Sequence, residues 1–122
     1  MKGGRDMIQI AICDDELQDL EHIAALIRKH LSSTAASIQT FSSSESFLHT
    51  VGISSFDILF LDIEMPEMDG IKAGMKLRDW NTDYKIIMLT VREDRFRDAF
   101  KIGAFRFVSK PINEVEFCLA IN

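Results

Sequence analysis

The chain has 122 residues, of which 47% are hydrophobic and 27% are charged, and its formal net charge is −5 at pH 7. This size and balance predict one globular domain with a single core, and they argue against direct nucleic-acid binding, which calls for a basic surface. The sequence holds no uninterrupted run of about 18 apolar residues, so no membrane helix is predicted.

The N-terminal residues carry charge without an apolar segment behind them, so we read no secretory signal and expect a cytoplasmic protein. Cys13 and Cys118 lie too far apart for a metal-binding motif and are expected to be small, buried or half-buried free thiols. Arg92, Arg95 and Arg97 alternate with acidic residues, which favours a solvated helix face over a phosphate-binding patch.

The chain alternates between short apolar runs and amphipathic segments. The apolar runs predict strands over residues 7–13, 36–41, 58–61, 85–90 and 105–109. Apolar residues at helical spacing predict helices over residues 17–31, 43–51, 70–80, 96–103 and from 111 onward. Strands that alternate with helices in this way predict a doubly wound, five-stranded parallel α/β domain.

Local signals predict how the helices begin. Ser42 with Glu45 three residues on is a capping-box pattern before the second helix, and Asp69 is a plausible N-cap of the third. Pro111 suits the first turn of the last helix. Gly74 inside the third helix indicates either close packing or a weak helix.

Helical spacing also predicts which side chains face the core. The inward stripes are expected to include Phe96, Ala99 and Phe100 in the fourth helix, and Ile112, Val115 and Leu119 in the last. Phe117 and Ile121 fall off that last stripe. They are expected either to pack in the ordinary way or to face a dimer partner or a further domain.

Polar residues stand at the ends of four predicted strands. Asp14 and Asp15 follow the first strand, Asp62 the third, Thr90 the fourth and Lys110 the fifth. Because the carboxyl ends of parallel strands lie at one edge of the sheet, these side chains should converge there. Three carboxylates call for a hard divalent cation such as Mg²⁺, while lysine and threonine suit a phosphoryl group.

Each of these residues has an ordinary alternative. Asp14 and Asp15 alone would more often be helix caps, Thr90 a strand-end cap, and the Lys110–Pro111 pair a turn. Their joint placement at strand ends is what favours a site. Asp62 stands out because a predicted buried strand ends on it and the turn-forming residues Pro66 and Asp69-Gly70 follow closely.

Several motifs together carry a family resemblance. They are the acidic pair Asp14-Asp15, Asp62-x-x-Met65-Pro66, Asp69-Gly70, Thr90, and Phe107-x-x-Lys110-Pro111. From Ile8 to its C-terminus the chain resembles the receiver domain of a two-component response regulator. The resemblance implies a flavodoxin-like sheet with strand order 2-1-3-4-5.

The resemblance also implies a Mg²⁺-dependent phosphorylation site. Asp62 would accept a phosphoryl group from a sensor histidine kinase. Asp15, Asp62 and the backbone carbonyl of Glu64 would bind Mg²⁺, with Asp14 acting through water. The domain would catalyse only its own phosphorylation and dephosphorylation, and would not otherwise be an enzyme.

Three further roles follow from the same resemblance. Thr90 and Lys110 would each contact a phosphoryl oxygen, and together with Asp62 they form the predicted reacting set. Phe107 would be the aromatic switch that turns inward when Thr90 moves towards the phosphate. Phosphorylation would thereby shift a pre-existing conformational equilibrium that controls an output, expected to be transcription.

Two positions depart from the commonest receiver pattern. Val91 is bulkier than the small residue often found after the threonine, and we expect it to narrow access for attacking water. Glu64 either adds negative charge at the pocket mouth or simply points to solvent.

The output lies outside the residues that carry the resemblance. We expect residues 1–122 to be a receiver cut from a longer regulator, with a C-terminal output domain absent, in preference to a compact single-domain regulator. Three features resemble regulators with a LytTR-type DNA-binding domain: the acidic pair, the sequence from Asp62 to Pro66, and the phenylalanine-rich fourth helix and fifth strand. The domain is expected to dimerise on phosphorylation and not to contact nucleic acid or membrane itself.

Two rival functions stay open on sequence grounds. One is a small phosphatase or phosphotransferase of the haloacid-dehalogenase type, which usually places an aspartate where this chain has Glu64. The other is a receiver-like interaction module that is never phosphorylated, against which the complete set of acids, threonine and lysine argues.

Overall fold

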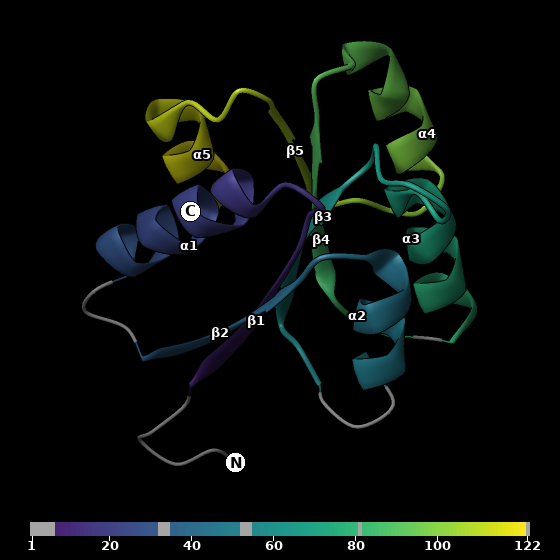
Figure 1. The fold of residues 1–122 in the computed structure, drawn as a ribbon, viewed down its shortest axis with the longest axis horizontal. Helices are drawn as coiled ribbons and strands as arrows, with labels where there is room; N and C mark the ends of the chain where they lie inside the picture. Colours follow the sequence, from purple (N-terminus) through teal and green to yellow (C-terminus); the bar gives the residue numbers. More distant parts are fainter. Residues whose placement is uncertain (1–6, 32–34, 52–54, 81, 122) are drawn as a thin grey trace.

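The computed structural model describes residues 7–31, 35–51, 55–80 and 82–121. A five-stranded sheet with the order β2-β1-β3-β4-β5 forms its centre, and every neighbouring pair is parallel (Figure 1). The strands are β1 (Ile8–Cys13), β2 (Ala36–Phe41), β3 (Ile58–Asp62), β4 (Lys85–Thr90) and β5 (Arg106–Ser109). The predicted fold class and strand order are confirmed.

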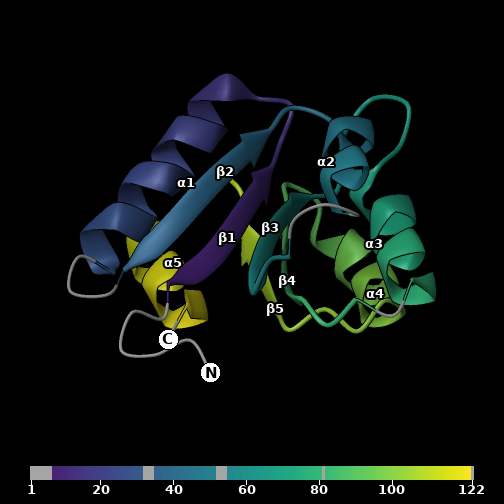
Figure 2. The ribbon, with the colours of Figure 1, turned by 90° about the horizontal axis from the view of Figure 1, so that it is seen from below.

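Helices cover both faces of the sheet. They are α1 (Leu17–His30), α2 (Ser44–Val51), α3 (Gly70–Asp79), α4 (Phe96–Phe100), which follows the 3₁₀ helix η2 (Glu93–Arg95), and α5 (Glu114–Ile121). Helices α1 and α5 lie on one face, and α2, α3 and α4 lie on the other (Figures 1 and 2). None of the helices in the described residues has both the length and the apolar character that a bilayer-spanning segment requires.

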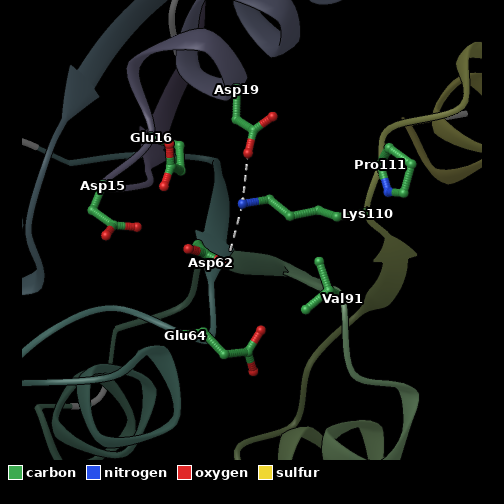
Figure 3. A pocket seen from close by; sticks show the side chains of 8 residues that line it. All are labelled: Asp15, Glu16, Asp19, Asp62, Glu64, Val91, Lys110 and Pro111. Carbon is green, nitrogen blue, oxygen red and sulfur yellow. Dashed lines mark ion pairs between the residues drawn. The ribbon is translucent and has the colours of Figure 1, made fainter.

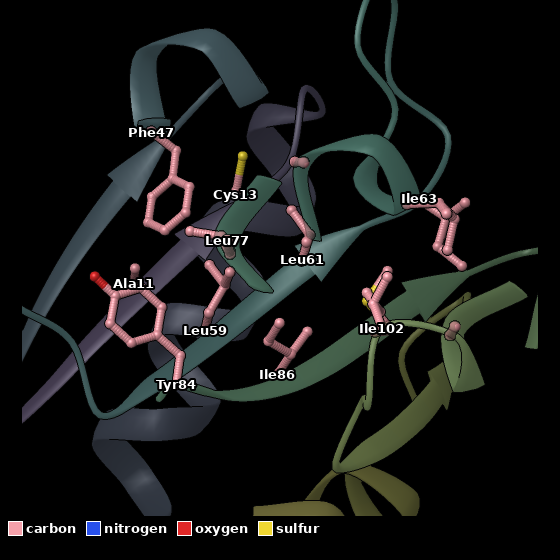
Figure 4. Close-up of a cluster of buried hydrophobic side chains, with 14 of the residues drawn as sticks. Ala11, Cys13, Phe47, Leu59, Leu61, Ile63, Leu77, Tyr84, Ile86 and Ile102 are labelled. Carbon is pink, nitrogen blue, oxygen red and sulfur yellow. The ribbon is translucent and has the colours of Figure 1, made fainter. Parts of the chain in front are cut away.

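The sheet divides the expected single core into two, one on each of its faces, because side chains alternate along the strands. In β3, Leu59 and Leu61 face the core beneath α2, α3 and α4, which Figure 4 shows. Phe60, between them, faces the core beneath α1 and α5. The central strand is therefore buried on both faces, and its last residue is delivered to the carboxyl edge of the sheet.

The inward face of α5 differs from the prediction. Phe117 is fully buried and stacks on Phe60, with ring centroids 5.2 Å apart, whereas Val115 and Leu119 are each 69% exposed. Two stripes at helical spacing compete in this sequence, and the larger aromatic side chain fills the space over β3. The N-terminus is also later than expected, because Asn113 caps the helix by accepting the Glu116 N–H at 3.0 Å.

Smaller corrections concern other helix positions. Ser43, not Ser42, caps α2, since its hydroxyl accepts the Ser46 N–H at 3.1 Å. Phe100 is exposed and does not join the core. The inner face of α4 is filled by the smaller Ala99.

Other local predictions are confirmed. Asp69 caps α3 by accepting the Lys72 N–H at 2.9 Å. Gly74 marks close packing, because a Cβ there would overlap the Ile102 side chain. Cys13 is buried and Cys118 half-buried, as expected. The expected stops of the first and second helices, at residues 32–34 and 52, lie outside the described residues.

Candidate functional site

Side chains from the ends of β1, β3, β4 and β5 converge at the carboxyl edge of the sheet. Asp14 and Thr90 are fully buried and Asp62 is 2% exposed, a degree of burial unusual for aspartate. Lys110 follows β5 and points towards the aspartates (Figure 3). The parallel topology thus brings together residues that are far apart in the sequence.

Lys110 forms the electrostatic centre of the site. Its Nζ lies 2.7 Å from Asp14 Oδ2, 2.8 Å from Asp19 Oδ2 and 3.4 Å from Asp62 Oδ1. These carboxylates raise the pKa of Lys110 despite its burial, so the ammonium stays charged. The sequence patterns did not lead us to expect Asp19 in the site, although it lies in the first turn of α1, close behind three other acids.

Three carboxylates meet in a group suited to a metal ion. Oxygen atoms of Asp14, Asp15 and Asp62 all lie within 4.8 Å of one another. Burial, followed by the charge of Asp14, raises the pKa of Asp62 to about 8. Burial also raises the pKa of Asp14, although Lys110 and the Glu16 N–H oppose this shift. Such a cluster is unfavourable when bare, and its hard oxygen donors fit Mg²⁺.

Glu64 contributes its carboxylate to Thr90 and not to the acidic group. Thr90 Oγ1 donates a hydrogen bond to Glu64 Oε1 at 2.6 Å and accepts one from the Arg92 N–H at 2.9 Å. Arg95 lies on the other side, with its Nη1 3.8 Å from Glu64 Oε2. Glu64 therefore does not simply point to solvent. The role predicted for its backbone carbonyl stays a prediction.

Arg95 ties several carboxylates together at the rim of the site. Its Nη2 lies 3.3 Å from Asp69 Oδ2 and its Nε 2.9 Å from Asp98 Oδ2, in addition to the contact with Glu64. The expectation of a solvated helix face holds for the exposed pair Arg92–Asp94. It is wrong for Arg95, because the fold brings α3 and the β3–α3 loop next to it.

Phe107 lies in an aromatic cluster with α4. Its ring centroid is 5.0 Å from that of Phe96 and 5.0 Å from that of Phe100. The ring is half-buried and packs at the edge of the core that contains Met88, its neighbour on β4. The residue predicted as the switch is therefore held on the side of β5 that faces α4.

A pocket of about 380 Å³ opens above the aspartates. It is lined by Asp15, Glu16, Asp19, Asp62, Glu64, Val91, Lys110 and Pro111, all of which Figure 3 shows. Val91 is exposed and lines this pocket, and its expected effect on water access stays a prediction. Asp62 can thus be reached from solvent although its own side chain is buried.

The Asp69–Gly70 motif owes its glycine to close backbone contact. A Cβ on Gly70 would overlap the backbone carbonyl oxygen of Asp62. The Gly70 N–H donates to Ile63 O at 2.8 Å, which holds the start of α3 against the end of β3. This contact fixes the loop that carries Glu64.

Comparisons with known proteins agree with this architecture. Residues 10–122 match the family described as the response regulator receiver domain. The chain is 35% identical over 115 residues to the response regulator protein TodT of Pseudomonas putida, covering 93% of this chain and 49% of that protein. It is 28% identical over 110 residues to the alkaline phosphatase synthesis transcriptional regulatory protein PhoP of Bacillus subtilis, covering 88% and 44%. The chain therefore spans about half the length of these curated relatives.

Solved structures show the same fold at lower identity. The response regulatory domain of protein mrkE from Klebsiella pneumoniae superposes with a TM-score of 0.84 at 23% identity, covering 93% of this chain and 92% of that one. The chemotaxis protein CheY4 of Vibrio cholerae gives a TM-score of 0.80 at 19% identity, covering 95% and 97%.

The family match extends over nearly all of the chain and accounts for the acidic edge of the sheet. Receiver domains act in phosphorelay signalling, are phosphorylated on an aspartate, bind Mg²⁺ at an acidic cluster and are partnered by histidine kinases. The names of the relatives do not bear on the LytTR-type output domain, which stays a prediction. The chain belongs to the receiver domains of two-component response regulators.

Proposed function

We propose that Asp62 accepts a phosphoryl group from a phosphohistidine of a sensor histidine kinase. One observation carries the proposal: Asp62 belongs to the group of three carboxylates, lies 3.4 Å from the Lys110 ammonium and lines an open pocket. No other acid in the described residues combines these three properties.

In the transfer, a carboxylate oxygen of Asp62 forms a bond to phosphorus while the bond between phosphorus and the histidine nitrogen breaks. Lys110 offsets negative charge on the phosphoryl oxygens. Mg²⁺, held by Asp15, Asp62 and the backbone carbonyl of Glu64 with Asp14 helping through water, would supply the remaining charge compensation. The protein acts on no other substrate in this scheme and reverses its own modification by hydrolysis.

The conformational switch begins at Thr90. A hydroxyl has one proton to donate, and here Thr90 donates it to Glu64. To donate to a phosphoryl oxygen, Thr90 must release Glu64. This move vacates space beside β4, which Phe107 can enter after leaving Phe96 and Phe100. Phosphorylation thus favours one of two packings.

Val91 is proposed to slow hydrolysis of the aspartyl phosphate. Its exposed side chain lines the pocket through which an attacking water must pass. Val91→Ala should shorten the half-life of the phosphorylated domain. An unchanged half-life would rule out this role.

The rival functions have less support. A phosphatase of the haloacid-dehalogenase type would need a free general acid two residues after Asp62, but the Glu64 carboxylate is bound to Thr90 and faces Arg95. An interaction module would have no need of the buried aspartates and lysine, whose burial destabilises the charged cluster.

We further propose that the domain controls an output domain that follows it in a longer protein. The basis is that the curated relatives are about twice as long as this chain and include proteins named as transcriptional regulators. A DNA-binding output, dimerisation on phosphorylation and a cytoplasmic location belong to this proposal.

The test is intact mass after incubation with acetyl phosphate, with and without Mg²⁺. We expect a Mg²⁺-dependent gain of one phosphoryl group in the wild type and no gain in Asp62→Asn. Asp57→Asn is the matched control, because Asp57 precedes the same strand at its opposite end. No gain in the wild type would leave the interaction module as the better function.

A further inference from the structure

A cysteine, a histidine and a glutamate meet where the end of α1 packs against α5. The Sγ of Cys118 lies 3.6 Å from His30 Nδ1. The other ring nitrogen of His30, Nε2, lies 3.0 Å from Glu114 Oε2. Glu114 and Cys118 are four residues apart on α5, so both face the same side of the helix, towards His30.

The acid sets the tautomer of the histidine. Glu114 also accepts a hydrogen bond from Lys29 Nζ at 2.7 Å, and the two basic neighbours lower the pKa of its carboxyl. An ionised carboxylate accepts the Nε2–H of His30, which leaves the Nδ1 lone pair facing the Cys118 thiol. The same carboxylate and the C-terminal end of α1 both lie beside the His30 ring.

The thiol is also accessible. Cys118 lines a groove of about 320 Å³ together with His30, Glu114, Val115 and Leu119. Its side chain is half-buried, in contrast to Cys13, which is fully buried and whose pKa is raised to about 12 by burial and nearby acids. The apolar wall of the groove suits the carbon atoms of a small ligand.

We propose that Cys118 is a site of thiol–disulfide exchange with a low-molecular-weight disulfide. His30 takes the thiol proton, and the thiolate attacks one sulfur of the disulfide. The original S–S bond breaks, a mixed disulfide forms on Cys118, and the departing thiolate takes the proton from His30. This reaction needs no group of the phosphorylation site and is independent of the proposed function.

The test uses oxidised glutathione with the folded domain and follows the mixed disulfide by intact mass and peptide mapping. At pH 7 we expect Cys118 to react and Cys13 not to react. His30→Gln should slow the reaction roughly tenfold or more. His22→Gln is the matched control, because His22 is exposed on the same helix, away from Cys118. The His22→Gln variant should form the mixed disulfide at the wild-type rate.

The pH profile separates a general base from a merely structural residue. Well above the ordinary thiol pKa, the wild-type and His30→Gln rates should converge, because the thiolate then forms without a base. Equal rates at pH 7, or a deficit in His30→Gln that persists at high pH, would overturn the proposal. Should His30→Gln fail to fold, the proposal can still be tested by comparing the folded wild type with the wild type unfolded in urea. Cys118 must react faster in the folded protein at pH 7 than in urea, and an equal or lower rate overturns the proposal.

Discussion

The Thr90 hydroxyl donates its proton to Glu64 Oε1 at 2.6 Å, so the proposed phosphate ligand already has a partner before any phosphate arrives. Arg95 adds to this arrangement by lying 3.8 Å from the second oxygen of Glu64. The contact joins the loop after β3 to the end of β4 and favours the unphosphorylated packing. Activation must therefore exchange one hydrogen-bond acceptor of Thr90 for another.

Glu64→Ala should ease activation. It removes the acceptor that holds Thr90 and one negative charge near Asp62. Because the Glu64 carboxylate is partly exposed, we expect the barrier to phosphorylation to fall by only about 1 kcal/mol. This corresponds to a reaction with acetyl phosphate that is about fivefold faster. The rate is measured by intact mass on samples quenched at successive times. Glu93→Ala, at an exposed acid nearby, should leave it unchanged. A slower reaction in Glu64→Ala would contradict the proposed role of the Thr90–Glu64 hydrogen bond.

Phe117→Ala should destabilise the domain by about 3–5 kcal/mol, because it removes a fully buried ring stacked on Phe60. Leu119→Ala, at a position 69% exposed on the same helix, should change stability by no more than about 0.5 kcal/mol. Urea unfolding of both variants measures the difference. Similar losses would mean that the inward face of α5 is not the one described.

Gly70→Ala and Gly74→Ala should differ although both lie in α3. A Cβ at Gly70 meets the rigid backbone of Asp62, so we expect a loss of about 3 kcal/mol and slower phosphorylation. A Cβ at Gly74 meets the tip of Ile102, which can move, and alanine favours the helix, so stability should stay within about 1 kcal/mol. Thermal unfolding compares the two. Equal losses would contradict this distinction.

Stability should fall as pH rises in the presence of EDTA. The pKa of Asp62 in the folded state is raised from 3.8 to about 8, so the folded state binds more protons than the unfolded state between these values. Unfolding free energy therefore decreases across this range. Asp62→Asn should remove much of the decrease and be more stable than the wild type above pH 8, by at least about 1 kcal/mol.

Mg²⁺ provides the control for that experiment. It should stabilise the wild type at pH 8 and stabilise Asp62→Asn much less, because one carboxylate of the cluster is missing. Urea midpoints at several pH values, with Mg²⁺ or EDTA, measure both effects. A wild-type stability that rises with pH in EDTA would contradict the raised pKa of Asp62.

The sequence by itself determined the alternation of strands and helices, because the apolar periods of both are local and strong. It also determined which residues end the strands, and from these the acidic edge of the sheet with Asp14, Asp15, Asp62, Thr90 and Lys110. Asp69 was correctly identified as a cap, since capping depends on a few neighbouring residues.

Only the tertiary structure decided which of two apolar stripes of α5 faces the sheet, because both fit a helix and the space above Phe60 selected Phe117. It also decided that Asp19 joins Lys110, that Glu64 binds Thr90 and that His30 meets Cys118. These pairs join separate elements, and no local pattern encodes the distance between their side chains. That distance is set by how the helices pack on the sheet.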